Sequence, residues 1–233
     1  MRRFLEQDLE QIRSHLLRMG QKSVESVRLA MKALVDAEPK LKKTVYANDD
    51  EIDELENLVD SEATRLLSTC APVAADLRFI VTTMKVSHEL ERVGDEAKAI
   101  ARRAKRALAH DYHNIPRMAE LSLQMLEDAL AVFVEFDQAK AESIWTQDLE
   151  VDKLNKENHK HFTALVSETP TLAPAIFEMV FISKSLERIG DHAVGISKEI
   201  VFMATSKEVR HAEEYKKSSL KKKLAAAQSE AAP

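Results

Sequence analysis

The sequence has very few of the residues that make turns, with four glycines and six prolines among 233 residues. Average proteins contain roughly 7% glycine and 5% proline, so hairpins and tight turns must be scarce here. Leu, Ala, Glu and Lys are abundant instead, and all four favour helices. The composition therefore argues against a protein built from many short strands and predicts an all-helical chain, long enough to bury a core of its own.

Cysteine and long apolar runs are also nearly missing. The single cysteine, Cys70, excludes an internal disulfide and a zinc site built from paired cysteines. No run reaches the roughly 18 apolar residues of a transmembrane helix. The first residues, MRRFLEQDLEQIR, are too charged for a signal peptide. We therefore expect a soluble, cytoplasmic protein without direct membrane insertion.

The chain has no excess of positive charge. Its formal net charge of -5 argues against a nucleic-acid partner, because nucleic-acid binding depends on neutralising phosphates. Residues 207–233 carry seven Lys or Arg against four Glu, so the acidic excess lies in residues 1–206. We expect residues 207–233 to be a charged, low-complexity tail outside the fold.

Apolar residues recur every three to four positions in six long segments, which is the spacing of amphipathic helices. Prolines or polar stretches separate the segments, and the longest polar connector is HDYHN at residues 110–114. The expected helices cover residues 4–36, 41–68, 75–109, 117–137, 140–166 and 175–205.

One hexapeptide occurs twice, as LERVGD at Leu90–Asp95 and LERIGD at Leu186–Asp191. The two copies lie 96 residues apart, and each contains one of the four glycines. A second pair, EIDEL at Glu51–Leu55 and EVDKL at Glu150–Leu154, matches in the same order at a spacing of 99 residues. Because matching pieces fall on two different helices, we infer an internal duplication.

The duplication predicts both the fold class and the point at which the chain divides into two units. We expect two tandem three-helix bundles, the first over residues 1–110 and the second over residues 111–206.

Each hexapeptide places two carboxylates on one helix face. Glu91 and Asp95 are four residues apart, as are Glu187 and Asp191, so each pair shares a face. Two acids at this spacing raise each other's pKa unless a cation lies between them. Gly94 would let another group approach the helix backbone, at a cost of about 1 kcal/mol in helix propensity relative to alanine.

More acids lie on the helix before each hexapeptide. In the first unit Glu56 and Asp60 repeat the Glu-x-x-x-Asp spacing, and Asp49 and Asp53 have Asp-x-x-x-Asp. If the two helices pack antiparallel, these acids could face the hexapeptide. Carboxylates without sulfur ligands suit magnesium, calcium, manganese or iron. The alternatives are a solvated acidic face or a motif that only packs the third helix.

The second unit has fewer acids at the corresponding positions. Asp152 keeps the place of Asp53, whereas Asn155 and His159 stand where the first unit has Glu56 and Asp60. We therefore expect a weaker second metal site, at Glu187 and Asp191 with Asp152, unless Glu157, His161 or His192 contributes a further ligand.

The sequence offers no catalytic group of residues, so we do not expect an enzyme. Ferritin-like di-iron enzymes need two Glu-x-x-His motifs in one bundle, and only Glu208 and His211 have that spacing. There is no glycine-rich phosphate loop and no nucleophile elbow. The competing function is a carboxylate-bridged metal storage or redox bundle. We expect four histidines to be surface or hydrogen-bonded residues rather than ligands: His15, His88, His110 and His113.

Three segments together resemble the PhoU family: APVAADLRFI at residues 71–80, HELERVGDEAKAIARR at 88–103 and LERIGDHAVGISKEIVF at 186–202. The resemblance covers residues 1 to about 211. It implies two similar three-helix bundles and a regulator of phosphate uptake and phosphate-starvation signalling. The implied partners are the ATPase subunit of the phosphate ABC transporter and the phosphate-sensing histidine kinase, both restrained when phosphate is plentiful. A homodimer is expected.

The resemblance also implies metal ions, including iron clusters, at the repeated acidic motifs. Iron is the expected metal, with zinc, manganese or magnesium as alternatives. Carried onto this sequence, the ligands are Glu56, Asp60, Glu91 and Asp95 in the first unit and Glu187 and Asp191 in the second.

Overall fold

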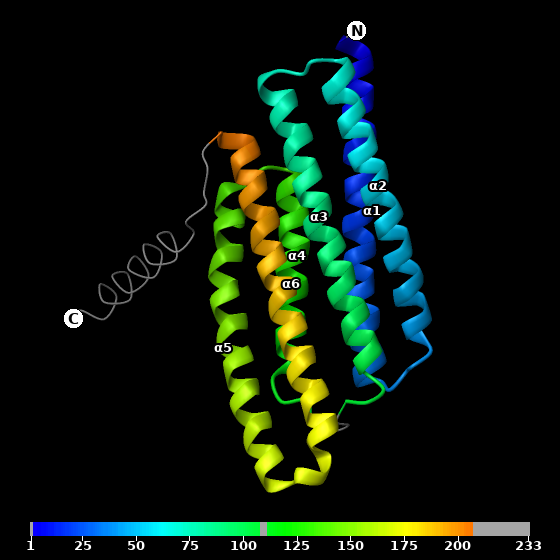
Figure 1. The fold of residues 1–233 in the computed structure, drawn as a ribbon. Helices are drawn as coiled ribbons and strands as arrows, with labels where there is room; N and C mark the ends of the chain where they lie inside the picture. The colour runs from blue at the N-terminus through cyan, green and yellow to red at the C-terminus, as the bar shows by residue number, and fades with distance from the viewer. Residues whose placement is uncertain (1, 108–110, 207–233) are drawn as a thin grey trace, which may run out of the picture.

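The computed structural model describes residues 2–107 and 111–206, and within these ranges it contains helices and no strand. The all-α prediction of two tandem three-helix bundles is confirmed (Figure 1). The predicted tail, including Glu208 and His211, and the connector residue His110 lie outside the described residues. The elements are α1 (Arg2–Val35), α2 (Leu41–Thr69), α3 (Ala74–Arg103), α4 (Ile115–Val134), α5 (Gln138–Glu168), a 3-10 turn η1 (Pro170–Leu172) and α6 (Ala173–Thr205).

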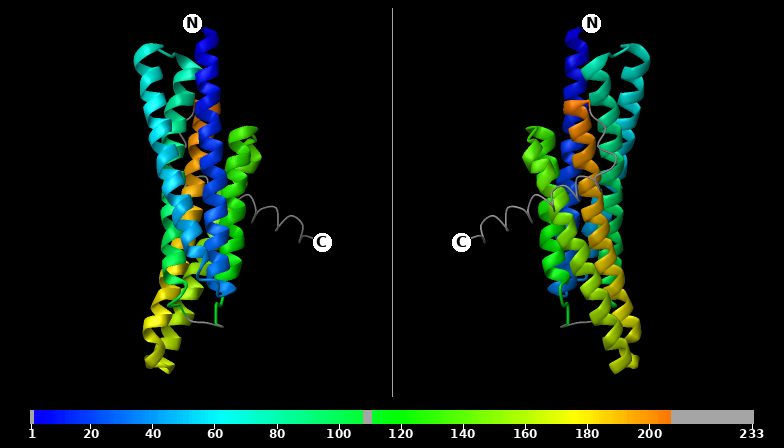
Figure 2. Two further views of the ribbon diagram at one scale, coloured as in Figure 1. Left: turned by 90° about the vertical axis from the view of Figure 1, so that its right-hand side faces the viewer. Right: turned by 90° about the vertical axis from the view of Figure 1, so that its left-hand side faces the viewer.

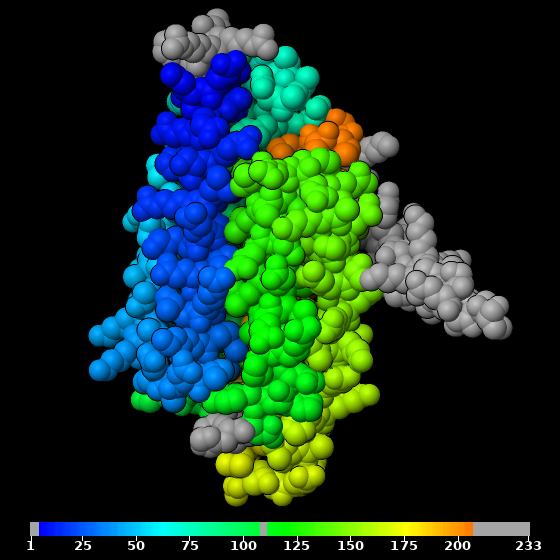
Figure 3. All heavy atoms as spheres, turned by 180° about the vertical axis from the view of Figure 1, so that it is seen from behind, coloured from blue at the N-terminus to red at the C-terminus, as the bar shows by residue number. Residues whose placement is uncertain are grey.

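The six helices run along one long axis, and the second unit is displaced along that axis relative to the first (Figures 1 and 2). Helices α3 and α6 form the main contact between the units, and α1 meets α4 on the opposite face (Figure 3). One cluster of buried apolar side chains extends through both units. None of the described helices combines enough length and apolar character to cross a membrane.

Helices α3 and α6 pack antiparallel along the junction of the two units. Arg78, near the start of α3, donates from Nε to the carbonyl of Met203 near the end of α6, at 3.3 Å. At the other end, Arg103 Nη1 lies 2.7 Å from Glu178 Oε2 near the start of α6. The duplicated hexapeptides therefore lie opposite each other in the middle of the molecule.

Two helix ends, those of α3 and α4, differ from the prediction by three residues or more, and the others lie within two residues of it. Helix α3 ends at Arg103 rather than at residue 109, because the chain must turn there toward Tyr112, whose Oη donates to the Leu34 carbonyl of α1 at 3.2 Å. Helix α4 starts at Ile115, with Pro116 in its first turn, where proline needs no hydrogen-bond donor. It ends at Val134 rather than residue 137, because Asp137 instead caps α5 by accepting from the Lys140 amide at 3.0 Å.

Candidate metal centre

Equivalent serines hold both hexapeptides against the first helix of their unit. Ser23 of α1 is buried, and its Oγ lies 2.9 Å from the Met19 carbonyl oxygen of its own helix and 3.1 Å from the carbonyl oxygen of Leu90. Ser122 of α4 is also buried, and its Oγ donates to the carbonyl of Leu186 at 2.9 Å. The internal duplication therefore extends to individual side-chain hydrogen bonds, and it fixes α3 and α6 in the same way within their bundles.

The glycine of each hexapeptide faces a buried aspartate on the preceding helix. A Cβ at Gly94 would lie 3.1 Å from Ile52 Cδ1 and 3.5 Å from Asp49 Oδ1. A Cβ at Gly190 would lie 3.7 Å from Asp148 Oδ1. Asp49 and Asp148 are only 2% and 1% exposed, so each glycine lies against a buried carboxylate, while the tightest neighbour of Gly94 is the side chain of Ile52. This agrees with the expected close approach at Gly94.

The buried Asp49 is neutralised from within the protein. Lys98, one turn after Gly94 on α3, forms a hydrogen-bonded ion pair with Asp49. That hydrogen bond is the largest influence raising the pKa of Lys98, because it favours the charged ammonium. Asp49 is therefore a packing and charge-pairing residue here, and its side chain is already occupied.

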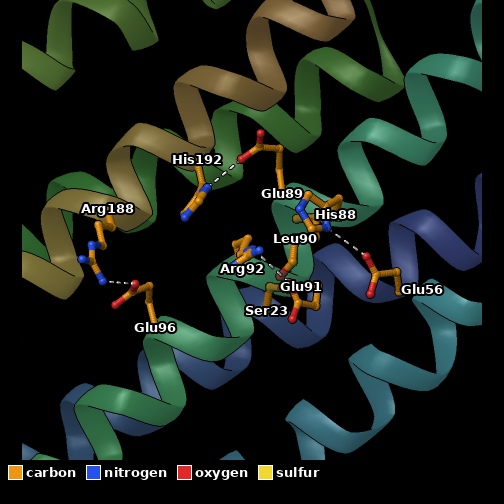
Figure 4. A network of polar contacts seen from close by, with 10 residues as sticks. All are labelled: Ser23, Glu56, His88, Glu89, Leu90, Glu91, Arg92, Glu96, Arg188 and His192. Atoms are coloured by element: carbon orange, nitrogen blue, oxygen red, sulfur yellow. Dashed lines mark hydrogen bonds and ion pairs between the residues drawn. The ribbon is translucent and has the colours of Figure 1, made fainter.

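Three side chains of the first unit form a possible metal-binding cluster where α2 faces α3. Glu56, His88 and Glu91 each offer one ligand atom, and these atoms lie within 4.8 Å of one another. His88 Nδ1 lies 3.2 Å from Glu56 Oε1 (Figure 4). Glu91 Oε2 is buried without a hydrogen-bond partner, and the nearest cation, Arg92 Nε, is 3.6 Å away. A carboxylate oxygen left in this state fits a bound cation.

The electrostatics of this cluster also favour a cation. Burial, followed by the negative charges of Asp95 and Glu56, raises the pKa of Glu91. Burial and the charge of Asp49 likewise raise the pKa of Asp53. Both shifts mean that the folded chain concentrates more negative charge than it neutralises at this place. A metal ion would relieve the repulsion.

The remaining predicted ligands of the first unit lie around the cluster rather than in it. Asp60 is exposed on α2, and Asp53 also reaches solvent there although its carboxyl is partly desolvated. Asp95 is exposed and lines a pocket between α3 and α6. The structure thus brings Glu56 and Glu91 together and adds His88. Sequence reasoning expected His88 to be a surface or hydrogen-bonded residue, and it is both, with a 57% exposed side chain. Its three-residue spacing from Glu91 was the available signal for a ligand.

The second unit replaces two members of the cluster. Asn155 stands at the place of Glu56, and its Oδ1 accepts a hydrogen bond from Ser183 at 2.8 Å. Lys184 stands at the place of His88 and forms an ion pair with Glu187, the counterpart of Glu91. The ammonium group lies beside the acid that a metal would need. His159 is exposed, and its Nδ1 lies 3.4 Å from the Thr163 hydroxyl.

Acids nevertheless gather around the second hexapeptide. Although Asp191 reaches solvent, burial of its carboxyl raises its pKa to about 6, with the charges of Glu187, Asp148 and Asp152 adding to the shift. Lys184 opposes it. This group fits a cation less well than the first cluster, because part of its charge is already balanced.

Comparison with known proteins places the chain in a family. The PhoU domain model matches twice, at residues 16–104 and 115–200. The chain is 34% identical over 209 residues to a phosphate-specific transport system accessory protein PhoU homolog of Pseudomonas aeruginosa, covering 88% of this chain and 86% of the relative. A homolog of the same description from Clostridium acetobutylicum is 32% identical over 213 residues, with 89% and 97% covered.

Solved structures agree in fold. The crystal structure of PhoU from Pseudomonas aeruginosa superposes with a TM-score of 0.84 at 33% identity, covering 87% of this chain and 99% of that one. The phosphate transport system regulatory protein PhoU from Streptococcus pneumoniae gives a TM-score of 0.80 at 26% identity, covering 88% and 99%. With a family model matching both three-helix units and relatives similar along most of their length, this chain belongs to the PhoU family.

Proposed function

We propose that this protein is an accessory regulator of phosphate transport that works by binding other proteins. The observation that carries the proposal is the family match over both units, residues 16–104 and 115–200. The relatives' names describe accessory and regulatory proteins of the phosphate transport system. Long helices in two similar units offer extended faces for docking, consistent with action by binding.

The proposed partners are the ATPase subunit of the phosphate ABC transporter and the phosphate-sensing histidine kinase, in the cytoplasm. The protein restrains both when phosphate is plentiful, without turnover of its own, and acts as a homodimer. Complementary charge across such contacts mainly sets the association rate and the choice of partner.

We further propose that Glu56, His88 and Glu91 hold a metal ion. Two carboxylates and one imidazole suit iron, zinc or manganese, and magnesium less well because it prefers oxygen ligands. Glu187, Asp191 and Asp152 form the weaker second site. In this function the ion supplies positive charge that holds α2 against α3, and it needs no open coordination position for chemistry.

Gene deletion with complementation tests the regulatory role. Cells without the protein should express phosphate-starvation genes in high phosphate, and the wild-type gene should restore repression. The transporter ATPase should co-purify with the tagged protein. Normal phosphate uptake and normal starvation-gene expression in the deletion strain, together with no co-purifying transporter subunit, would refute the assignment.

The competing metal storage or redox function is tested separately. It requires oxygen- or peroxide-dependent turnover by iron-loaded protein. Within residues 2–107 and 111–206 the one three-residue metal-binding group contains a single histidine, rather than the paired Glu-x-x-His motifs of di-iron enzymes. We therefore expect no turnover.

A further inference from the structure

A pocket of about 570 Å³ lies between α3 and α6, and none of Glu56, His88 and Glu91 lines it. Tyr46 of α2 and Phe181 of α6 contribute aromatic side chains to its wall. The volume falls within the roughly 300–1,000 Å³ of small-molecule sites. The metal-site proposal and the regulatory proposal do not account for this pocket.

The lining of the pocket is strongly cationic although the chain as a whole is acidic. Its two acids are Asp95 and Glu96. Its six basic residues are Arg92, Lys98, Arg102, Arg103, Lys184 and Arg188.

Four of these basic side chains already have acidic partners. Lys98 pairs with Asp49, and Lys184 pairs with Glu187. The other two pairs are Arg103 with Glu178, at 2.7 Å, and Arg188 with Glu96, at 2.9 Å.

Arg92 and Arg102 are left with unused charge. Arg102 is exposed and forms no ion pair or hydrogen bond within the described part of the chain. Arg92 has only its chain neighbour Glu91, at 3.6 Å. Because that separation is too long for a strong hydrogen bond, the Arg92 guanidinium keeps most of its donors available.

The imperfect duplication explains why Arg92 lacks an acidic partner across the junction of the two units. Arg92 and Arg188 are the arginines of the two hexapeptides, and Arg188 pairs across the junction with Glu96. The residue equivalent to Glu96 in the second unit is His192, which instead lies 2.6 Å from Glu89 through Nδ1 (Figure 4). The acid that symmetry would provide for Arg92 is therefore absent from that position.

We propose that this pocket binds a small molecule carrying two or more linked phosphate groups. Guanidinium groups bind phosphate oxygens with two parallel hydrogen bonds. Arg92 and Arg102 are about 15 Å apart along α3 at 1.5 Å per residue, with the small Ala99 between them, so one phosphate cannot serve both well. The phosphates could belong to inorganic pyrophosphate or tripolyphosphate, or to a nucleotide whose base contacts Tyr46 or Phe181.

Isothermal titration of the full, metal-free protein tests the proposal with pyrophosphate, tripolyphosphate, ADP and ATP, and with orthophosphate as the single-phosphate comparison. Metal-free protein is needed because condensed phosphates chelate metals. The double variant R92Q/R102Q should weaken binding by about tenfold or more, since it removes charge-assisted hydrogen bonds. The single variant R102Q changes an exposed, unpaired side chain and keeps the test valid if the double variant fails to fold.

The matched control is R28Q/R117Q, which removes the same charge from exposed arginines of α1 and α4. It should bind like the wild type. Tighter binding of nucleotides than of tripolyphosphate would identify a nucleotide as the ligand, whereas equal binding would identify the phosphate chain alone. The proposal is overturned if no probe binds at about 1 mM, or if the control loses as much affinity as R92Q/R102Q.

Discussion

At the scale of single residues, one acid of each hexapeptide, Glu91 in the first and Asp191 in the second, is held where burial disfavours its charged form. Asp191 has a pKa of about 6 in the folded protein against 3.8 for the unperturbed group. Between these values the folded state binds more protons than the unfolded state, so stability falls as pH rises through this window. A salt-bridged aspartate has the opposite effect: its pKa is lowered in the folded state, so stability rises with pH.

We predict that Asp191→Asn stabilises the metal-free protein at neutral pH and flattens its stability profile between about pH 4 and pH 6. Because Asp191 reaches solvent, the gain should be modest, about 2–4 °C in Tm. Thermal unfolding followed over this pH range measures it. Asp60→Asn removes the same charge at an exposed position and serves as the control. An equally steep profile in the Asp191 variant would contradict the prediction.

The second residue-scale prediction concerns the metal cluster. Glu91→Gln and His88→Ala should each lower metal affinity by about 10- to 100-fold, since even an outer partner of a metal ligand contributes that much. Metal content per chain, measured after purification without chelator, gives the result. Asp60→Asn distinguishes the two candidate sites, because Asp60 belongs to the Glu56-x-x-x-Asp60 motif of the sequence but not to the three-residue cluster of the structure. If Asp60→Asn releases as much metal as Glu91→Gln, the Glu-x-x-x-Asp pair rather than the Glu56–His88–Glu91 group is the site.

At the scale of elements, the serine contacts tie the first and third helices of each unit together. Ser122→Ala removes one buried hydrogen bond, and Ser23→Ala removes a buried hydroxyl that is shared between the Met19 and Leu90 carbonyls, so each should lower the free energy of unfolding by about 1 kcal/mol. Urea unfolding measures the change. Ser68→Ala, which removes an exposed serine bonded within its own helix, should have little effect. A loss no larger than that of Ser68→Ala would show that these contacts do not stabilise the packing of the first helix against the third within each unit.

The element scale also shows what the sequence could and could not predict. Apolar spacing located all six helices, because each buries a periodic stripe in a common core. It missed the end of α3 because Tyr112 must reach Leu34 of another helix, a contact that local periodicity does not contain. The cluster was only partly predictable for the same reason. The antiparallel register of α2 and α3 decides that His88 meets Glu56 while Asp60 points away to solvent.

At the scale of the whole molecule, the buried apolar cluster is continuous across both units. We therefore predict one cooperative unfolding transition. Trp145, the single tryptophan, is buried in the second unit and reports on it by fluorescence, while far-UV circular dichroism reports on all helices. The two midpoints should coincide. Separate midpoints would mean that the units unfold independently despite their shared core.

The antiparallel junction of two duplicated units has a consequence for how this molecule can vary. In a symmetric pair of identical three-helix chains, every substitution would appear on both sides of the axis. Here the copies share one polypeptide, so equivalent positions can carry different residues, such as His88 and Lys184, or Glu96 and His192. The first unit can therefore keep the Glu56–His88–Glu91 cluster, while in the second unit Lys184 forms an ion pair with Glu187. Gene duplication thus converts a symmetric scaffold into one with two distinguishable ends.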